Sequence, residues 1–146
     1  MEYVVKQVAA SEILAVRSAE LFNGLAPESC IFEEDDEPDA KHLALYLGNE
    51  VIGCLSVFKA SNEYFEDENQ FRYRGMAIAK KYQGNRLGNL LLNKADRIVD
   101  ENDSDFIWME ARFPAVNFYR RNGYNVVGNP FDIEGFGQHL LMYKRL

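Results

Sequence analysis

The chain has 146 residues, and its 16 basic and 23 acidic side chains give a formal net charge of −7. This length predicts one domain over residues 1–146, and the charge opposes binding to a polyanion, so no nucleic-acid partner is expected. Because the apolar runs are far shorter than the about 20 residues that cross a bilayer, and because Cys30 and Cys54 lack metal-ligand spacing, we expect a soluble cytoplasmic protein without metal or membrane contact.

The first third of the chain predicts a strand, a helix and an irregular segment. Tyr3–Val8 reads as a short strand, and Ser11 fits the N-cap of a helix that runs to about Phe22. Arg17 falls in the middle of the apolar face of this helix. A structural ion pair or a snorkelling stem is our main interpretation of Arg17, and a substrate contact is the alternative. Residues 24–40 have no clear period and predict a loop or a short irregular helix.

The middle of the chain is rich in β-strand patterns. Lys41–Leu47 and Val51–Lys59 are close enough in sequence to form a hairpin. The polar stretch Ser61–Asn69 turns the chain, and Phe71–Ala79 is the next predicted strand. His42, at the start of a strand, is expected at the surface.

The C-terminal half predicts two further helices and three strands. The helices are Arg86–Glu101, with an apolar stripe, and the shorter Pro114–Asn122, with Pro near its start. The strands are Asp105–Ala111, Tyr124–Val127 and Gln138–Lys144. The order of the elements predicts an α/β chain with a mixed sheet and helices on both of its faces.

The segment Tyr73–Gly88 runs from a strand through a basic, glycine-containing turn into a helix. The first N–H groups of a helix have no internal partner and the helix dipole is positive there, so such a turn can hold a phosphate. Lys80, Lys81 and Arg86 add positive charge in an otherwise acidic chain. The segment contains neither G-x-x-x-x-G-K-[ST] nor G-x-G-x-x-G. Taken alone, it is weak evidence for a phosphate site, and an ordinary strand-to-helix turn is the main interpretation.

Two motifs resemble those of the Gcn5-related N-acetyltransferases, the GNAT superfamily. Gln83–Gly88 is similar to the family's phosphate loop, [QR]-x-x-G-x-[GA], with Arg86 in place of the first glycine. Ala115–Tyr124 is similar to the family pattern A-x-x-F-Y-x-x-x-G-[FY]. Where family members often carry Asn, three residues before that alanine, this chain has Arg112. The resemblance covers nearly the whole chain.

The resemblance implies a fold and a cosubstrate. The fold is the GNAT fold, a mixed sheet of six to seven strands that splays between its fourth and fifth strands, where acetyl-CoA enters. The pantetheine arm would pair with the main chain of Met76–Ile78, one of whose N–H groups would also stabilise the developing oxyanion. The pyrophosphate would lie against Gln83–Asn89. The cofactor-binding residues implied in this way are Met76, Ala77, Ile78, Gln83, Gly84, Asn85, Arg86, Leu87, Gly88, Asn89 and Asn117.

The same resemblance suggests residues for proton transfer. Tyr119 stands where the family places its general acid, and a phenol is protonated at neutral pH. A buried tyrosine that only packs is the alternative. Glu110 or His139 could act as the general base. Glu110 could instead pair with Arg112 or with an arginine of a neighbouring strand, and His139 could be a hydrogen-bonded residue of the sheet.

The function implied is transfer of an acetyl group from acetyl-CoA to a primary amine, directly and without a covalent enzyme intermediate. A small-molecule amine is the main expectation. A protein or peptide N-acetyltransferase and a non-catalytic CoA-binding module are the alternatives, and a homodimer stays open. The acidic segment Glu33–Asp39 is interpreted as solvated surface; alternatively, it borders the acceptor site and favours a cationic amine.

Overall fold

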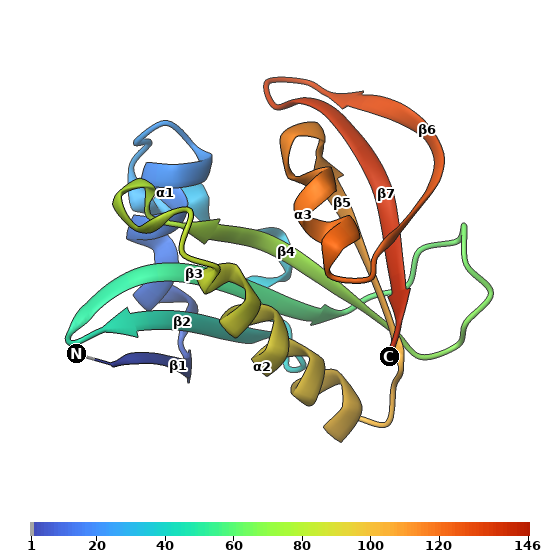
Figure 1. Cartoon of the computed structure of the whole chain (residues 1–146), viewed down its shortest axis with the longest axis horizontal. Coiled ribbons are helices and arrows are strands. Elements are labelled where there is room, and N and C mark those ends of the chain that lie inside the picture. The colour runs from blue at the N-terminus through green and yellow to red at the C-terminus, as the bar shows by residue number, and fades with distance from the viewer. Residues whose placement is uncertain (1) are drawn as a thin grey trace.

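The computed structural model describes residues 2–146, and its strands form one sheet with the order β1-β2-β3-β4-β5-β7-β6 (Figure 1). Neighbouring strands are antiparallel except β4 and β5, which are parallel, so the predicted mixed sheet is confirmed. The strands are β1 (Tyr3–Val8), β2 (Lys41–Leu47), β3 (Glu50–Lys59), β4 (Gln70–Ile78), β5 (Phe106–Arg112), β6 (Asn125–Ile133) and β7 (Gly137–Arg145).

Helices cover both faces of the sheet, as predicted. Leu43 and Leu45 of β2 belong to the core that packs against the longest helix, whereas Ala44 between them packs with Val16 of the first helix on the opposite face. Within residues 2–146, no helix has both the length and the apolar composition needed to cross a membrane. The α-helices are α1 (Leu14–Leu21), α2 (Leu87–Glu101) and α3 (Val116–Arg121). The 3₁₀ helices are η1 (Ala10–Ile13), η2 (Pro27–Cys30), η3 (Glu33–Asp36), η4 (Lys80–Tyr82) and η5 (Phe113–Ala115).

The sheet opens between β4 and β5. Their ladder contains only three pairs, which join Gln70–Arg72 to Phe106–Trp108 near the start of both strands. Beyond these pairs the two strands diverge (Figure 1), which confirms the predicted separation of the fourth and fifth strands. The Arg72 guanidinium donates to the Glu110 carboxylate across the opening, at 2.9 Å. The ion pair therefore links the strands where their backbone pairing has ended.

A bulge bends β4 at the opening. The register between β3 and β4 shifts between Cys54 and Ser56, and such a shift increases the local bend of a strand. Opposite this shift, Gly75 has a φ of +70°, a conformation that glycine adopts without steric cost. A Cβ atom at Gly75 would also lie 2.6 Å from Cε2 of Phe32. The glycine thus allows both the bend and the close approach of the Phe32 ring.

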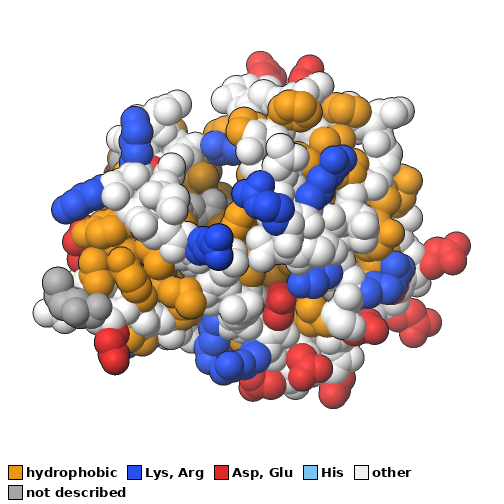
Figure 2. Space-filling view, in the orientation of Figure 1, with side chains coloured by type: hydrophobic (Ala, Val, Ile, Leu, Met, Phe, Trp, Pro, Cys, Tyr) orange, Lys and Arg blue, Asp and Glu red, His pale blue; other side chains and the backbone are white. Residues whose placement is uncertain are grey.

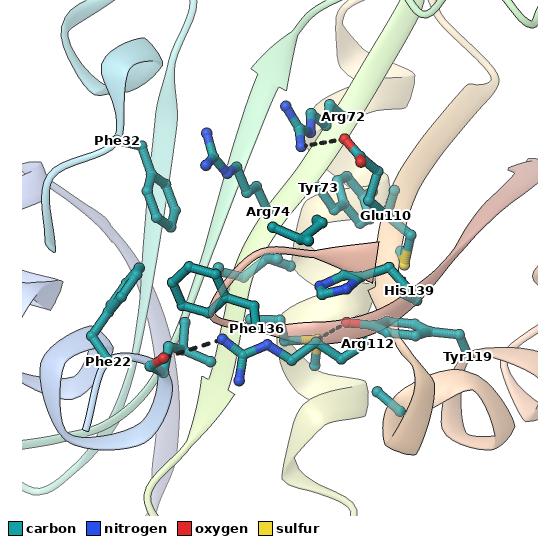
Figure 3. Close-up of a pocket in the computed structure, with 18 residues that line it drawn as sticks. Phe22, Phe32, Arg72, Tyr73, Arg74, Glu110, Arg112, Tyr119, Phe136 and His139 are labelled. Carbon is teal, nitrogen blue, oxygen red and sulfur yellow. Dashed lines mark hydrogen bonds and ion pairs between the residues drawn. The ribbon is translucent and has the colours of Figure 1, made fainter. Parts of the chain in front are cut away.

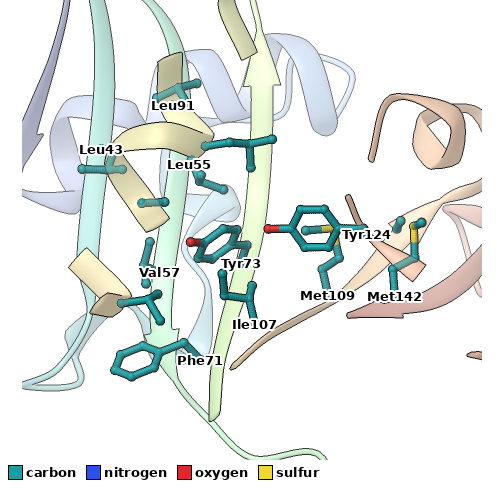
Figure 4. Packing of buried hydrophobic residues seen from close by; sticks show 14 of the residues in the cluster. Leu43, Leu55, Val57, Phe71, Tyr73, Leu91, Ile107, Met109, Tyr124 and Met142 are labelled. Carbon is teal, nitrogen blue, oxygen red and sulfur yellow. The ribbon is translucent and has the colours of Figure 1, made fainter. Parts of the chain in front are cut away.

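The main core joins the two halves of the opened sheet (Figure 4). Leu43 and Leu55 pack beneath Leu91 of α2, while the core continues to Met109 and Met142 beyond the opening. The Tyr73 hydroxyl donates to Asp96 Oδ1 at 2.7 Å, and burial raises the pKa of Tyr73. This tyrosine therefore remains a neutral hydrogen-bond donor within the core.

A buried ion pair fixes the segment between α1 and β2. Arg17 Nη1 lies 2.6 Å from Asp35 Oδ2 and its Nη2 lies 3.0 Å from Oδ1, and the side chains are 0% and 1% exposed. Arg17 also donates to the Cys30 carbonyl at 3.1 Å and to Ser56 Oγ at 2.8 Å. Burial alone would raise the pKa of Asp35, but hydrogen bonds from Arg17 and from the Phe32 N–H hold it below its usual value. The structural interpretation of Arg17 is confirmed.

Two surface predictions were wrong. His42 is buried, with Nδ1 2.8 Å from Ser56 Oγ and Nε2 3.1 Å from the Asp35 carbonyl oxygen. The acidic segment Glu33–Asp39 is not uniformly solvated, because Asp35 is buried against Arg17 and Glu34 pairs with arginines of β4. The side-chain hydrogen-bond partners of these groups lie 14 or more residues away in sequence, so no local pattern revealed them.

Several element boundaries also differ from the prediction. Ser11 lies inside η1, whose N-cap position is Ala9 without a side-chain hydrogen bond. The predicted helix Pro114–Asn122 is η5 followed by the short α3. The strand predicted to end at Val127 continues to Ile133 as β6, with a register shift on the way. Because β6 is at the edge of the sheet, its proline and glycine are tolerated there.

Asp35→Asn is expected to lower the free energy of unfolding by about 3–5 kcal/mol, since it leaves the Arg17 charge buried without a counter-charge. The pKa of Asp35 is lowered in the folded state, so its stabilisation is present above the unfolded pKa of about 4 and is lost as pH falls through the folded value. Urea unfolding should therefore show that the wild-type advantage over Asp35→Asn shrinks below about pH 4.

Asp36→Asn is the matched control, because Asp36 is exposed in the same 3₁₀ helix. This control should change the unfolding free energy by less than about 0.5 kcal/mol. An equal loss in both variants, or a wild-type advantage that does not change with pH, would contradict the assigned role of the ion pair.

Candidate active site

The larger pocket beside the opening, which we call the turn pocket, has a volume of about 700 Å³. It is formed by the end of β4, the turn into α2, the C-terminal end of α1 and α3. The predicted cofactor-binding residues that line it are Met76, Ala77, Ile78, Gln83, Gly84, Arg86, Leu87, Gly88 and Asn89. The structure therefore gathers most of that predicted set around one cavity.

Two predicted residues do not line this pocket. Asn85 donates its side-chain amide to the Tyr82 carbonyl at 3.1 Å, and the Asn117 side chain is exposed on α3. Conversely, the pocket has further lining residues that the sequence did not single out for this role. They are Glu20, Leu21, Tyr82, Ala115, Phe118, Arg121 and Asn122. Ala115, Phe118 and Asn122 had a usable signal, because they share one side of the motif helix.

The turn into α2 has an unusual backbone at Arg86. This N-cap residue has φ +60° and ψ +22°, and its side chain makes no capping hydrogen bond. A residue with a Cβ in this left-handed region costs about 1–2 kcal/mol relative to glycine. Glycine, which the similar family motif has at this position, would adopt this backbone without that cost. The first turn of α2 has no side-chain cap and faces the turn pocket.

Gly88 allows α2 to start close to β4 and α3. A Cβ atom at this position would lie 2.8 Å from Cε of Met76 and 2.9 Å from Cζ of Phe118. Contacts this short require the Met76 or Phe118 side chain to shift, so the present packing favours a residue without a Cβ. Packing therefore favours glycine at position 88, whereas the left-handed backbone is the constraint at Arg86.

The second pocket, which we call the aromatic pocket, has a volume of about 230 Å³ and lies between the diverging β4 and β5 (Figure 3). Phe22, Phe32 and Phe136 form one side of it; they come from the residue that follows α1, the segment before η3 and the β6–β7 turn. The rings of Phe22 and Phe136 pack edge to face, with 5.7 Å between their centres. Charged side chains from β4 and β5 also line this pocket; they are Arg72, Arg74, Glu110 and Arg112.

The two pockets meet at a small set of shared residues, which are Leu21, Met76, Ala115 and Tyr119. The Tyr119 hydroxyl donates to the Met76 sulfur at 3.5 Å, and its ring packs edge to face against Phe118 and Tyr124. Burial raises the pKa of Tyr119 above its usual value. A protonated hydroxyl therefore stands at the junction of two cavities, where it could donate a proton to a group between them.

Both candidate bases line the aromatic pocket. Glu110 pairs with Arg72, an arginine of the neighbouring strand, and not with Arg112. His139 Nδ1 lies 2.8 Å from the Gly137 carbonyl oxygen. Since a carbonyl can only accept, Nδ1 carries the proton in this contact, and Nε2 of a neutral ring keeps its lone pair. His139 can therefore accept a proton without breaking this hydrogen bond.

Glu34 couples the acidic segment to this pocket. Its carboxylate accepts hydrogen bonds from Arg74 at 2.6 Å and from Arg72 at 3.3 Å. Burial and the neighbouring charge of Arg74 lower the pKa of Arg72, while the two glutamates act in the opposite direction. Two of the acidic side chains expected at the surface, Glu34 and Asp35, are thus already paired with arginines.

Comparison with known proteins identifies relatives of this arrangement. A family model described as an acetyltransferase (GNAT) domain matches residues 38–126. YitI of Bacillus subtilis (strain 168), described as an uncharacterised N-acetyltransferase, is 28% identical over 142 residues, which are 97% of this chain and 95% of YitI. The match to the family model spans both motif regions, the opening between β4 and β5, and α3.

Solved structures share the fold over nearly their whole length. Escherichia coli ElaA has a TM-score of 0.79 at 17% identity, with 99% of this chain and 100% of ElaA covered. An aminoglycoside 6'-N-acetyltransferase complexed with coenzyme A has a TM-score of 0.77 at 13% identity, with 97% and 96% covered. At these identities the likeness concerns the fold alone.

Arg86→Gly is expected to raise the free energy of unfolding by up to about 1 kcal/mol, because relief of the left-handed backbone is partly offset by greater freedom of the unfolded chain. Arg86→Val should lower it by about 1–3 kcal/mol, since a β-branched residue fits this region poorly. Chemical unfolding of both variants measures the difference. Equal destabilisation by glycine and valine would contradict a backbone constraint at this position.

Proposed function

Because the chain belongs to the GNAT acetyltransferase family, we propose that it transfers an acetyl group from acetyl-CoA directly to the primary amine of a small molecule. The observation that carries this proposal is the junction of the turn pocket and the aromatic pocket at Met76 and Tyr119. One cavity can hold the acyl donor and the other the amine, with a proton donor between them. We also propose that residues 1–146 act as a single domain in the cytoplasm.

The turn pocket fits the phosphates of acyl-CoA. The α2 N-terminus has no side-chain cap, so its N–H groups and positive dipole are available to an anion. A Cβ atom at Gly84 would meet no atom within 4 Å, so the turn is open on its outer side. Lys80, Lys81 and Arg86 add positive charge near the turn. On the face of the molecule drawn in Figure 2, basic side chains lie across the middle and acidic ones lie mostly toward the margins. Bound acyl-CoA supplies the acyl group as an activated thioester.

The free edge of β4 suits the thiol arm of that molecule. Past Arg72, the structure pairs no residue of β4 with β5, so the backbone of Met76–Ile78 borders an open gap. An extended amide-containing arm can pair with such an edge as an added strand. A backbone N–H at this edge would then donate to the acyl oxygen as it gains charge, a contact that typically contributes about 3 kcal/mol.

The proposed proton transfers use the groups that surround the junction. Tyr119 would protonate the departing thiolate, since its hydroxyl stays neutral and lies at the shared wall. We favour His139 over Glu110 as the base, because Nε2 is free to accept a proton while Glu110 is paired with Arg72. The small volume of the aromatic pocket supports a small acceptor over a folded protein surface.

The proposal is tested by incubating the protein with acetyl-CoA and separate panels of small amines, amino acids and peptides. Release of free thiol should depend on the acceptor, and mass spectrometry should find the acetylated amine. Acetylation confined to peptides would move the assignment to a peptide N-acetyltransferase. Binding of acetyl-CoA without turnover on any panel would favour a non-catalytic CoA-binding module.

Tyr119→Phe is expected to lower kcat by about 10²–10⁴-fold, the usual contribution of a general acid, and to leave the Kd for acetyl-CoA nearly unchanged. Because the pKa of Tyr119 is raised, the wild-type rate should show no loss of this acid below about pH 10. Stopped assays of thiol release and calorimetric titration provide the two readouts.

Tyr64→Phe is the matched control, since Tyr64 is 57% exposed and lines neither pocket. Full activity is expected for this control. A Tyr119→Phe protein that keeps wild-type kcat would remove Tyr119 from the proposed mechanism.

A further inference from the structure

Arg112 is the one guanidinium of the aromatic pocket without a carboxylate partner among residues 2–146. Its Nη2 donates to the Leu21 carbonyl at 3.1 Å, and its guanidinium carbon lies 5.5 Å from the centre of the Phe136 ring (Figure 3). A guanidinium has five N–H donors. One hydrogen bond therefore leaves most of its donors available at the pocket wall.

The other charges of this pocket are already paired. Arg72 and Arg74 share the Glu34 carboxylate, and Arg72 also binds Glu110. Three guanidinium groups thus face two carboxylates, so the walls carry an unbalanced positive charge. Asp132 and Glu134 in the β6–β7 region are exposed and do not line the pocket, and solvent screens charges of that kind.

The free guanidinium lies close to the reaction site that the proposed function requires. Its hydrogen-bond partner, Leu21, is one of the residues that line both pockets. Arg112 itself lines only the aromatic pocket, so its free donors serve the acceptor side and not the acyl-donor side. The N–H groups of a guanidinium lie in one plane and match the geometry of a carboxylate, so the guanidinium can bind a carboxylate through two parallel hydrogen bonds.

We propose that the acceptor is an amine that also carries a carboxylate, as a free amino acid does, and that Arg112 binds this carboxylate. This inference rests on the proposed function, because it assigns the acceptor to the aromatic pocket. The rings of Phe22, Phe32 and Phe136 favour an apolar body on the same molecule. A polycationic amine is disfavoured, since Glu34 and Asp35 are paired and the remaining charge is positive.

The acceptor class is tested on the wild-type protein with matched pairs of molecules. Free amino acids with apolar side chains are compared with their carboxamides and with the corresponding decarboxylated amines, each rate expressed per neutral amine. The free acids should have a kcat/KM at least about tenfold higher, as expected when a hydrogen bond to a charged group is gained. Carboxamides or polyamines that react as well as the free acids would overturn the inference.

Arg112→Gln should lower kcat/KM for the free acids by about 10- to 100-fold and leave the carboxamides within about twofold. Arg112→Lys should recover only part of the loss, because an ammonium lacks the planar fork. Arg120→Gln is the matched control, since Arg120 is exposed on α3 and lines neither pocket. An equal effect of Arg112→Gln on acids and carboxamides would contradict a contact with the carboxylate.

Calorimetric titration separates this inference from the proposed function. With CoA present, the free amino acid should bind to wild type and bind at least tenfold more weakly to Arg112→Gln, whether or not turnover follows. Such binding without acetylation would support the anionic acceptor site and overturn the transfer reaction. Acetylation without any preference for carboxylates would support the transfer reaction and overturn the anionic acceptor site.

Discussion

The separation of β4 from β5 is the constraint on which both pockets depend. Only three residue pairs join the strands, and beyond them the bulge around Gly75 carries β4 away. Backbone groups at Met76–Ile78 are thereby left beside a gap, while Tyr119 of α3 reaches the same gap from the other side. A sheet paired along its whole length would have neither a free edge for an extended ligand nor a junction between two cavities.

The acceptor side depends on a buried ion pair remote from the proposed chemistry. Arg17 and Asp35 hold the segment that contains Phe32 and Glu34 against the sheet. The guanidinium carbons of Arg17 and Arg74 then lie 3.8 Å and 4.1 Å from the centre of the Phe32 ring. The same segment positions the Glu34 carboxylate to form ion pairs with Arg72 and Arg74 of β4. The wall and the charge of the aromatic pocket are therefore set by contacts between residues distant in sequence.

Much of the fold could be predicted from sequence, because periodicity and turn residues are local signals. The loop into α2 and the Tyr119 helix were found in this way, since both are continuous motifs. Burial of His42 could not be predicted, because its side-chain partner Ser56 lies 14 residues away on β3 and the Asp35 carbonyl belongs to a segment without periodicity. The extension of β6 was hidden by residues that usually end strands but are tolerated at an edge. The lack of a carboxylate partner for Arg112 could not be predicted either, because it depends on Glu110 pairing with Arg72 across the opening and not with Arg112.

A crystal structure of the protein with bound CoA tests the central claim most directly. The pyrophosphate should lie against the main chain of Gln83–Asn89, and the arm should pair with Met76–Ile78. The sulfur should come within about 3–4 Å of the Tyr119 hydroxyl, allowing for the longer reach of sulfur. The aromatic pocket should remain accessible on the far side of Tyr119. CoA bound away from the opening, or a sulfur remote from Tyr119, would contradict the account.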